Sequence, residues 1–89
     1  MFQKKFEIRN EKGLHLRAAG EFVKEATKYP CDIFMAKDNL KVNAKSIMSV
    51  LTLVAGKGSK ITIMTEGDKA EEALNNLGKL VSNGFGEEK

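Results

Sequence analysis

A single histidine stands directly before an alanine-rich stretch in "KGLHLRAAGEF", residues 12–22. If His15 is the N-cap of a helix, its side chain lies beside unpaired backbone N–H groups. These groups belong to Leu16, Arg17 and Ala18. Such donors, together with the positive end of the helix dipole, favour a bound phosphate or carboxylate. Arg17 adds a permanent charge whose forked donors suit phosphate oxygens. Because neutral imidazole is nucleophilic at pH 7, the cluster indicates a transferable phosphoryl group held as a phosphoramidate.

The other chemistry that a histidine could support is limited here. His15 is the only histidine of the chain, so no second imidazole can complete a metal site. No Cys–His or Ser–His–Asp spacing indicates a hydrolase. We therefore expect no bound metal and no cofactor. A structural interpretation stays open at this point, in which His15 is a solvated cap residue and Arg17 an ordinary surface charge.

The composition predicts one globular domain over residues 1–89. Hydrophobic residues make up 42% and charged residues 30% of the chain, as is usual for globular proteins. No stretch approaches the roughly 20 consecutive apolar residues of a membrane span, and no apolar run follows the N-terminal lysines, so we expect no secretory signal. The single cysteine, Cys31, cannot form an internal disulfide. We expect a cytoplasmic protein without membrane insertion.

The charge of the chain is only mildly basic. The sequence has 15 lysine and arginine residues against 12 acidic residues, for a net charge of +3. The two signs are interspersed, and the exposed face of the first predicted strand offers Gln3, Lys5 and Glu7 without an aromatic residue. A nucleic-acid-binding sheet needs a positive face that carries aromatic side chains. We therefore expect no nucleic-acid partner.

Hydrophobic periodicity divides the chain into strands and helices. Alternation with period two predicts strands over 2–8, 31–37, 40–43 and 60–66, and helical spacing predicts helices that begin near residues 16, 46 and 68. The order is therefore β-α-β-β-α-β-α. Each amphipathic helix must bury one face, and the economical solution is an α/β (α+β) open-faced sandwich: a four-stranded antiparallel sheet with three helices on one face.

The segment "KSIMSVLTLVAGKG" is interpreted as a short helix, because it has both an initiation and a termination signal, although its β-branched residues leave a strand as the alternative. Ser46 has the right type for its N-cap and Gly56 for its stop. Its apolar side is formed by Ile47, Val50, Leu51 and Val54. We expect Val50, together with Leu53 or Val54, to point into the core.

The third predicted helix begins with a pattern that resembles a capping box. Asp68 stands three residues before Glu71, a spacing at which side chains can cap a helix start. Gly84 is the predicted end of this helix.

The sequence resembles the HPr family, the histidine-containing phosphocarrier proteins of the bacterial phosphoenolpyruvate:sugar phosphotransferase system. The likeness covers nearly the whole chain. It is carried by "GLHLRAA", "DIF", "KVNAKSIMSVLTL", "EG" and "NGFGE". The resemblance implies the same β-α-β-β-α-β-α sandwich that the periodicity predicts.

The resemblance also implies roles for particular residues. His15 is expected to accept a phosphoryl group on its ring nitrogen nearest the backbone, from phosphorylated enzyme I, and to pass it to an enzyme IIA domain. Arg17 is expected to hold the phosphoryl oxygens. Ser46 corresponds to the regulatory serine that an HPr kinase/phosphorylase modifies in some organisms, where a catabolite-control transcription factor is a further partner.

The second helix is also expected to contribute to partner binding. Ile47, Met48 and Leu51 would form an apolar patch beside His15 if the two helix starts are neighbours, as they are in the family. Methionine adapts to differently shaped partners. For some of these residues, packing into the core remains the alternative.

The chain departs from the family motif at two positions. Ala18 stands where the family has proline, which restores an N–H group at the anion site and loses the fixed backbone angle of proline. Leu16 stands where a small residue is common, and it could influence which partner docks. These two replacements could change recognition of the phosphoryl donor and the rate of phosphoryl transfer.

Three functions from different classes remain. The first is a phosphocarrier, a covalent phosphoryl-transfer intermediate rather than a stand-alone enzyme. The second is a regulatory binding module of the same fold that signals carbon or nutrient state without sugar transport. The third, a small nucleic-acid-binding domain, has the least support. Nothing in the sequence indicates a dimer, and we expect a monomer.

Overall fold

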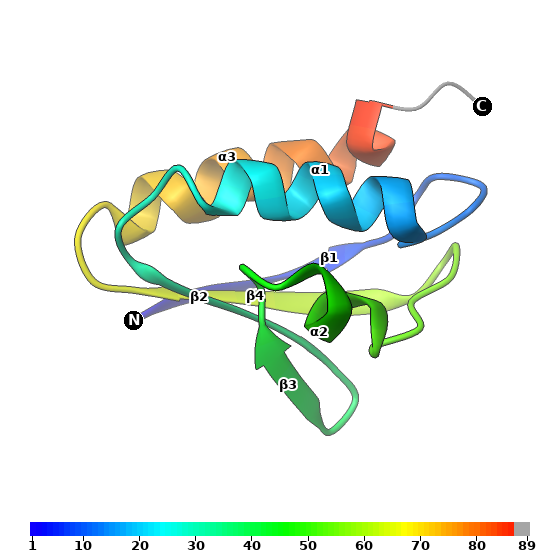
Figure 1. The fold of residues 1–89 in the computed structure, drawn as a ribbon, viewed down its shortest axis with the longest axis horizontal. Coiled ribbons are helices and arrows are strands. Elements are labelled where there is room, and N and C mark those ends of the chain that lie inside the picture. Colours follow the sequence, from blue (N-terminus) through cyan, green and yellow to red (C-terminus); the bar gives the residue numbers. More distant parts are fainter. Residues whose placement is uncertain (87–89) are drawn as a thin grey trace.

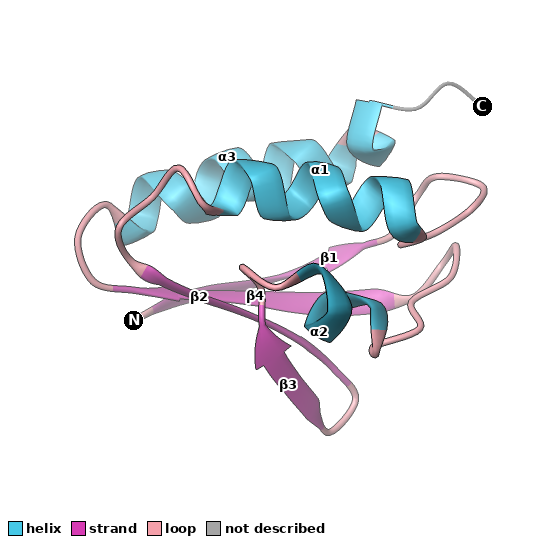
Figure 2. Cartoon of the chain, in the orientation of Figure 1, coloured by secondary structure: helices cyan, strands magenta, loops and turns pink. Residues whose placement is uncertain are grey.

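The computed structural model describes residues 1–86 and contains the predicted order of elements. The strands are β1 (Phe2–Glu7), β2 (Asp32–Lys37), β3 (Leu40–Asn43) and β4 (Lys60–Glu66), and the helices are α1 (Leu16–Ala26), α2 (Ile47–Leu51) and α3 (Ala70–Ser82) (Figures 1 and 2). A short 3-10 turn, η1 (Gly84–Gly86), follows α3. Glu87, the last residue of the family segment "NGFGE", lies outside the described residues.

The four strands form one antiparallel sheet with the order β1-β4-β2-β3. Helices α1 and α3 lie side by side over one face, and α2 contacts α1 and β3 (Figure 1). Within residues 1–86, no helix lies over the opposite face of the sheet (Figure 1). This is the open-faced sandwich predicted from the sequence, so the predicted fold class is confirmed.

The core lies between the sheet and its helices. Alternate residues of the central strands point inward, including Ile33, Met35, Ile61 and Ile63, all at most 1% exposed. One close approach depends on glycine: a Cβ on Gly78 of α3 would lie 2.5 Å from the ring of Phe6 on β1. The missing side chain at Gly78 therefore lets the aromatic ring pack directly against the helix.

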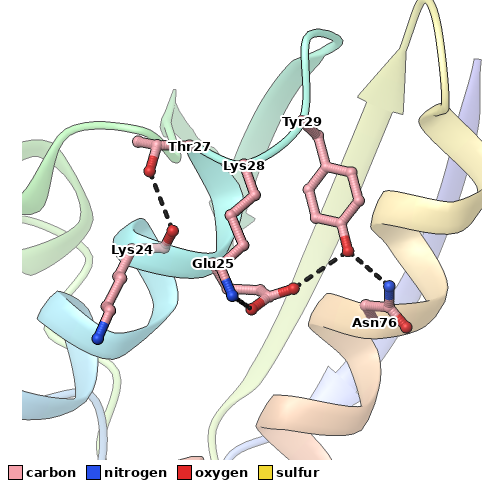
Figure 3. A network of polar contacts seen from close by, with 6 residues as sticks. All are labelled: Lys24, Glu25, Thr27, Lys28, Tyr29 and Asn76. Atoms are coloured by element: carbon pink, nitrogen blue, oxygen red, sulfur yellow. Dashed lines mark hydrogen bonds and ion pairs between the residues drawn. The ribbon is translucent and has the colours of Figure 1, made fainter.

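Tyr29 joins the end of α1 to α3 through its hydroxyl group (Figure 3). The hydroxyl donates to Glu25 Oε2 at 3.1 Å and accepts from Asn76 Nδ2 at 2.5 Å. Burial raises the pKa of Tyr29 above its usual value of 10.0; the bond from Asn76 opposes this shift, and the neighbouring Glu25 adds to it. The phenol therefore stays protonated at neutral pH, as its bond to Glu25 requires.

Two predicted helix boundaries were wrong. Helix α2 ends at Leu51 with Thr52 as C-cap rather than continuing to Gly56. Beyond it, Val54 has a left-handed φ of +50° and is 79% exposed, so it does not share the buried face; Leu53 is buried instead, as is Val50.

The start of α3 also differs from the prediction. The N-cap of this helix is Lys69, which has a left-handed φ of +64° and makes no side-chain capping bond. Asp68 therefore precedes the cap position and forms no capping box. The predicted end is confirmed, because α3 stops at Ser82 and Gly84 follows with a φ of +65°.

No helix within residues 1–86 is long and apolar enough to cross a membrane.

Candidate functional site

His15 occupies the N-cap position of α1, as the sequence predicts. Its backbone is extended, with φ −82° and ψ −177°, and its carbonyl accepts the first helical bond from the Ala19 N–H at 2.8 Å. The imidazole makes no capping bond to the helix. The half-buried side chain of His15 therefore stands at the helix start without occupying its backbone donors.

The first turn of α1 has the backbone arrangement on which the predicted anion site depends, and anion binding there stays a prediction. The N–H groups of residues 16–18 have no partner within the helix by their position, and no acidic residue lies in this turn. Arg17 is exposed, and Leu16 is 65% exposed, whereas Ala18 is fully buried. The positive end of the helix dipole and the Arg17 guanidinium are thus available to the same bound anion.

Two hydrogen bonds between Asn10 and Gly13 stabilise the loop before His15. The buried Asn10 side chain donates from Nδ2 to the Gly13 carbonyl at 2.7 Å, and the Gly13 N–H donates to the Asn10 carbonyl at 3.1 Å. Gly13 has a left-handed φ of +67°, which glycine adopts readily because it has no Cβ. Together these bonds fix the turn that leads into His15.

A second loop, residues 53–59, supports the His15 loop from outside. The Leu14 N–H donates to the Ala55 carbonyl at 2.8 Å. A Cβ on Gly13 would lie 2.7 Å from both the Ala55 carbonyl oxygen and Gly56 Cα, so the two backbones are in direct contact. The sequence analysis did not predict that residues 53–59 support the His15 loop. The glycine-rich run "AGKG" was the one local indication of a close backbone contact, and its first glycine was interpreted as the end of a helix.

The two loops are also hydrogen-bonded to each other farther from His15, at Ile8. The Ile8 N–H donates to the Ser59 carbonyl and the Gly58 N–H to the Ile8 carbonyl, both at 2.8 Å. Lys57 Nζ lies 2.5 Å from Glu11 Oε2, but this ion pair is exposed and adds little stability. The backbone bonds therefore fix the position of the His15 loop relative to residues 53–59.

Ser46 is the N-cap of α2, as predicted. Its Oγ accepts a hydrogen bond from the Ser49 N–H at 3.4 Å. Lys45, directly before Ser46, donates from Nζ to the Tyr29 carbonyl at 2.7 Å, which ties this helix start to the segment that follows α1. Helices α1 and α2 are in contact, so the structure brings the helix of Ser46 next to the helix of His15.

The three residues of the predicted apolar patch differ in exposure. Met48 is 73% exposed and Ile47 is 37% exposed, so both offer apolar surface. Leu51 is partly buried and packs against the core. Partner binding by these residues stays a prediction, and Met48 offers the largest accessible share of its side chain among them.

The described residues contain no group of three or more His, Cys, Asp or Glu side chains that could hold a metal ion. Cys31 is buried.

Comparison with known proteins points to one family. The sequence model described as "PTS HPr component phosphorylation site" matches residues 2–83. The chain is 42% identical over 81 residues to the HPr-like protein Crh of Bacillus subtilis, covering 91% of this chain and 95% of that protein. It is 46% identical over 81 residues to the phosphocarrier protein HPr of Pseudomonas aeruginosa, covering 90% of each chain.

Solved structures agree with this assignment. A crystal structure of HPr-C-His from Thermoanaerobacter tengcongensis matches with a TM-score of 0.96 and 44% identity, covering 100% of both chains. A structure described as the HPr dimer of the same organism matches with a TM-score of 0.78 and 44% identity, covering 98% of this chain and 100% of that one. The similar proteins thus include both HPr and Crh, and three of the similar solved structures are described as dimers.

Proposed function

The chain belongs to the HPr family of phosphocarrier proteins, and from this premise we propose that His15 is the phosphoacceptor. In this proposal His15 receives a phosphoryl group from phosphorylated enzyme I and passes it to enzyme IIA domains in phosphoenolpyruvate-dependent sugar uptake. One observation carries the proposal: His15 is the N-cap of an 11-residue helix whose first turn holds Arg17 and no acidic residue.

The geometry supports a simple transfer mechanism. The neutral ring nitrogen of His15 nearest the backbone attacks phosphorus, a P–N bond forms, and the bond between phosphorus and enzyme I breaks. The N–H groups of the first turn and the Arg17 guanidinium bind the phosphoryl oxygens and stabilise their charge. In the second step a nucleophilic group of the IIA domain attacks the phosphorus, the P–N bond breaks, and the imidazole is released. The chain is thus an intermediate between two enzymes.

The test of the transport role uses the isolated phosphorylated chain. Mixed with an enzyme IIA domain, it is expected to lose its phosphate while the domain gains one, as read by intact mass. Retention of the phosphate in the presence of IIA domains that a familiar HPr phosphorylates contradicts the transport role.

We expect Arg17→Ala to retain phosphorylation but to transfer more slowly. A hydrogen bond from a charged donor contributes about 1.5 to 3 kcal/mol, which corresponds to roughly a tenfold to hundredfold slower transfer. Quenched-flow measurement of labelling by phosphorylated enzyme I checks this. Lys24→Ala is the matched control, because it removes a positive charge from the last turn of the same helix. Equal rates for Arg17→Ala and the wild type contradict the role of Arg17.

A regulatory function is the second proposal, supported by the similarity to Crh proteins and by the position of Ser46 beside α1. In organisms with an HPr kinase/phosphorylase, phosphorylation of Ser46 adds about 1.5 to 2 negative charges at the start of α2. This charge repels an acidic partner such as the phosphoryl donor and attracts an arginine-rich one, for instance a catabolite-control transcription factor.

We expect Ser46→Asn to remove this modification without loss of fold. Asparagine caps helices about as well as serine, so α2 keeps its N-cap, but the hydroxyl that a kinase phosphorylates is gone. With an HPr kinase and ATP, the wild type is expected to gain an acid-stable phosphate and the variant none. An acid-stable phosphate on the variant places the modification elsewhere.

The remaining parts of the proposal concern the state of the chain. We propose that residues 1–89 act as a single cytoplasmic phosphocarrier domain. We expect the monomer to be the form that exchanges phosphate. Because a relative is described as a dimer, light scattering of the labelled chain is the check on this expectation.

A further inference from the structure

Strand β1 forms one edge of the sheet. It pairs with β4 on one side, and no strand of residues 1–86 pairs with its other side. The Ile8 N–H donates to the Ser59 carbonyl, on the side of β4. Because backbone groups alternate in direction along a strand, the N–H and C=O groups of Gln3, Lys5 and Glu7 face the open edge. These groups are a template with which another extended chain can pair.

A groove of about 320 Å³ lies beside this edge, between β1 and α3. Lys4 and Phe6 of β1 line it on one side, and Leu74, Gly78 and Lys79 of α3 line it on the other. Domains that bind peptides by strand addition gain affinity from hydrogen bonds at a sheet edge and specificity from pockets for alternate side chains. The open edge of β1 and the groove supply these two elements.

The charge of the groove indicates the kind of strand that fits. Among the described residues that line it, the two charged ones are Lys4 and Lys79. Lys4 Nζ lies 5.7 Å from the centroid of the Phe6 ring, within the range of a cation–π contact, so this positive charge stays at the groove. A strand with carboxylate side chains on this face therefore complements both lysines.

A second copy of the chain fits the same edge poorly. Antiparallel pairing of two β1 strands that uses all three open positions places Lys5 opposite Lys5 of the other copy. Like charges directly opposite each other destabilise a strand pair, and lysines on an edge strand are a common protection against self-pairing. The charge of β1 therefore favours an acidic strand over another copy of β1.

We propose that the edge of β1 is a docking site for an extended acidic segment of another protein. The segment adds to the sheet antiparallel to β1, and its acidic side chains lie in the groove at Lys4 and Lys79. The groove is lined by β1 and α3, whereas His15 and Arg17 belong to the start of α1. This inference therefore does not rest on the proposed function.

The probe for this site is a fluorescein-labelled eight-residue peptide in which glutamate alternates with valine. With its glutamates in the groove, its valines lie on the open face of the sheet, where their N–H groups donate to β1. We expect saturable binding in fluorescence anisotropy. By NMR, we expect the peptide to slow amide hydrogen exchange at Gln3, Lys5 and Glu7. The N–H groups of Lys4 and Phe6 already face β4 and serve as the internal reference.

Three variants test the role of the groove. Lys4→Gln and Lys79→Gln are each expected to weaken binding of the peptide about twofold to fivefold, the effect of one exposed ion pair. Lys5→Gln is the matched control. It removes the same charge from the same strand, but Lys5 lies on the open face, opposite Thr62, whereas Lys4 lies opposite the buried Ile63. The Lys5 variant is expected to keep the wild-type affinity.

A second peptide tests the backbone contacts. The same sequence with N-methylated valines keeps its charges but has no N–H donors toward β1, and we expect it not to bind. Binding of this peptide, equal losses for the three lysine variants, or no binding of the first peptide overturns the proposal. A dimer in light scattering that the first peptide does not dissociate also overturns it, because a second copy then covers the edge.

Discussion

His15→Ala is expected to abolish the acid-labile phosphate completely while the chain stays folded. No second histidine exists in the sequence, so no other imidazole can accept the phosphoryl group. The His15 side chain makes no capping bond and is only half-buried, so its removal costs at most about 1 to 2 kcal/mol, the range for a lost N-cap. Intact mass after incubation with the phosphoryl donor measures the first effect, and thermal unfolding measures the second.

The matched variant for this experiment is His15→Asn. Asparagine restores a good N-cap but is no phosphoacceptor, so it separates loss of chemistry from loss of helix stability. Both variants are expected to remain unlabelled with folded circular-dichroism spectra. An unfolded His15→Asn, or a labelled variant of either kind, contradicts the position of His15 as an accessible phosphoacceptor at the helix start.

Gly13→Ala is expected to have the largest effect on stability. A Cβ there would lie 2.7 Å from the Ala55 carbonyl oxygen and from Gly56 Cα, and backbone atoms cannot move aside as a flexible side chain can. The left-handed φ of +67° costs an alanine about 1 to 2 kcal/mol, and overpacking costs about 1 to 3 kcal/mol more. Chemical denaturation is expected to show a loss of about 2 to 5 kcal/mol, together with slower labelling of His15.

Two other glycines of the supporting loop allow the conformational cost of Gly13→Ala to be measured separately from its steric cost. Gly58 has a φ of +89° with open space around its Cβ position, and Gly56 has open space and no left-handed φ. Gly58→Ala is therefore expected to show only the conformational cost, and Gly56→Ala neither cost. If Gly13→Ala is no less stable than Gly58→Ala, the close contact between the loops does not hold the His15 loop in place.

The local part of the site was predictable from sequence. An N-cap position depends on a short run of residues, and the pattern from His15 to Ala19 carried both the helix start and the first turn in which we expect an anion to bind. The fold class was predictable as well, because alternation in the strands and helical spacing elsewhere leave few ways to bury three apolar helix faces.

The errors arose where the conformation depends on distant contacts. The apolar run after Ser46 continues to Val54 at helical spacing, yet the bond from Leu14 to Ala55 requires the chain to leave the helix after Leu51. Nothing local to the run indicates this bond, because its partner lies about 40 residues earlier in the sequence. The support of the His15 loop and the exposure of Val54 could therefore be found only in the structure.

The two departures from the family motif have different structural consequences. Ala18 is fully buried, and alanine is the best helix former, so the first turn of α1 forms without the proline of the family. Leu16 is 65% exposed and adds apolar surface directly after His15. We therefore expect the exchange at Leu16 to affect partner choice more than the exchange at Ala18.

The measurement that tests the central claim most directly is the intact mass of the chain after incubation with phosphoenolpyruvate and a generic enzyme I, followed by acid treatment. We expect a gain of one phosphate that acid removes and that is absent from His15→Ala. No gain, while enzyme I itself is phosphorylated and a familiar HPr is labelled in parallel, contradicts phosphoryl transfer from enzyme I to His15 in this chain.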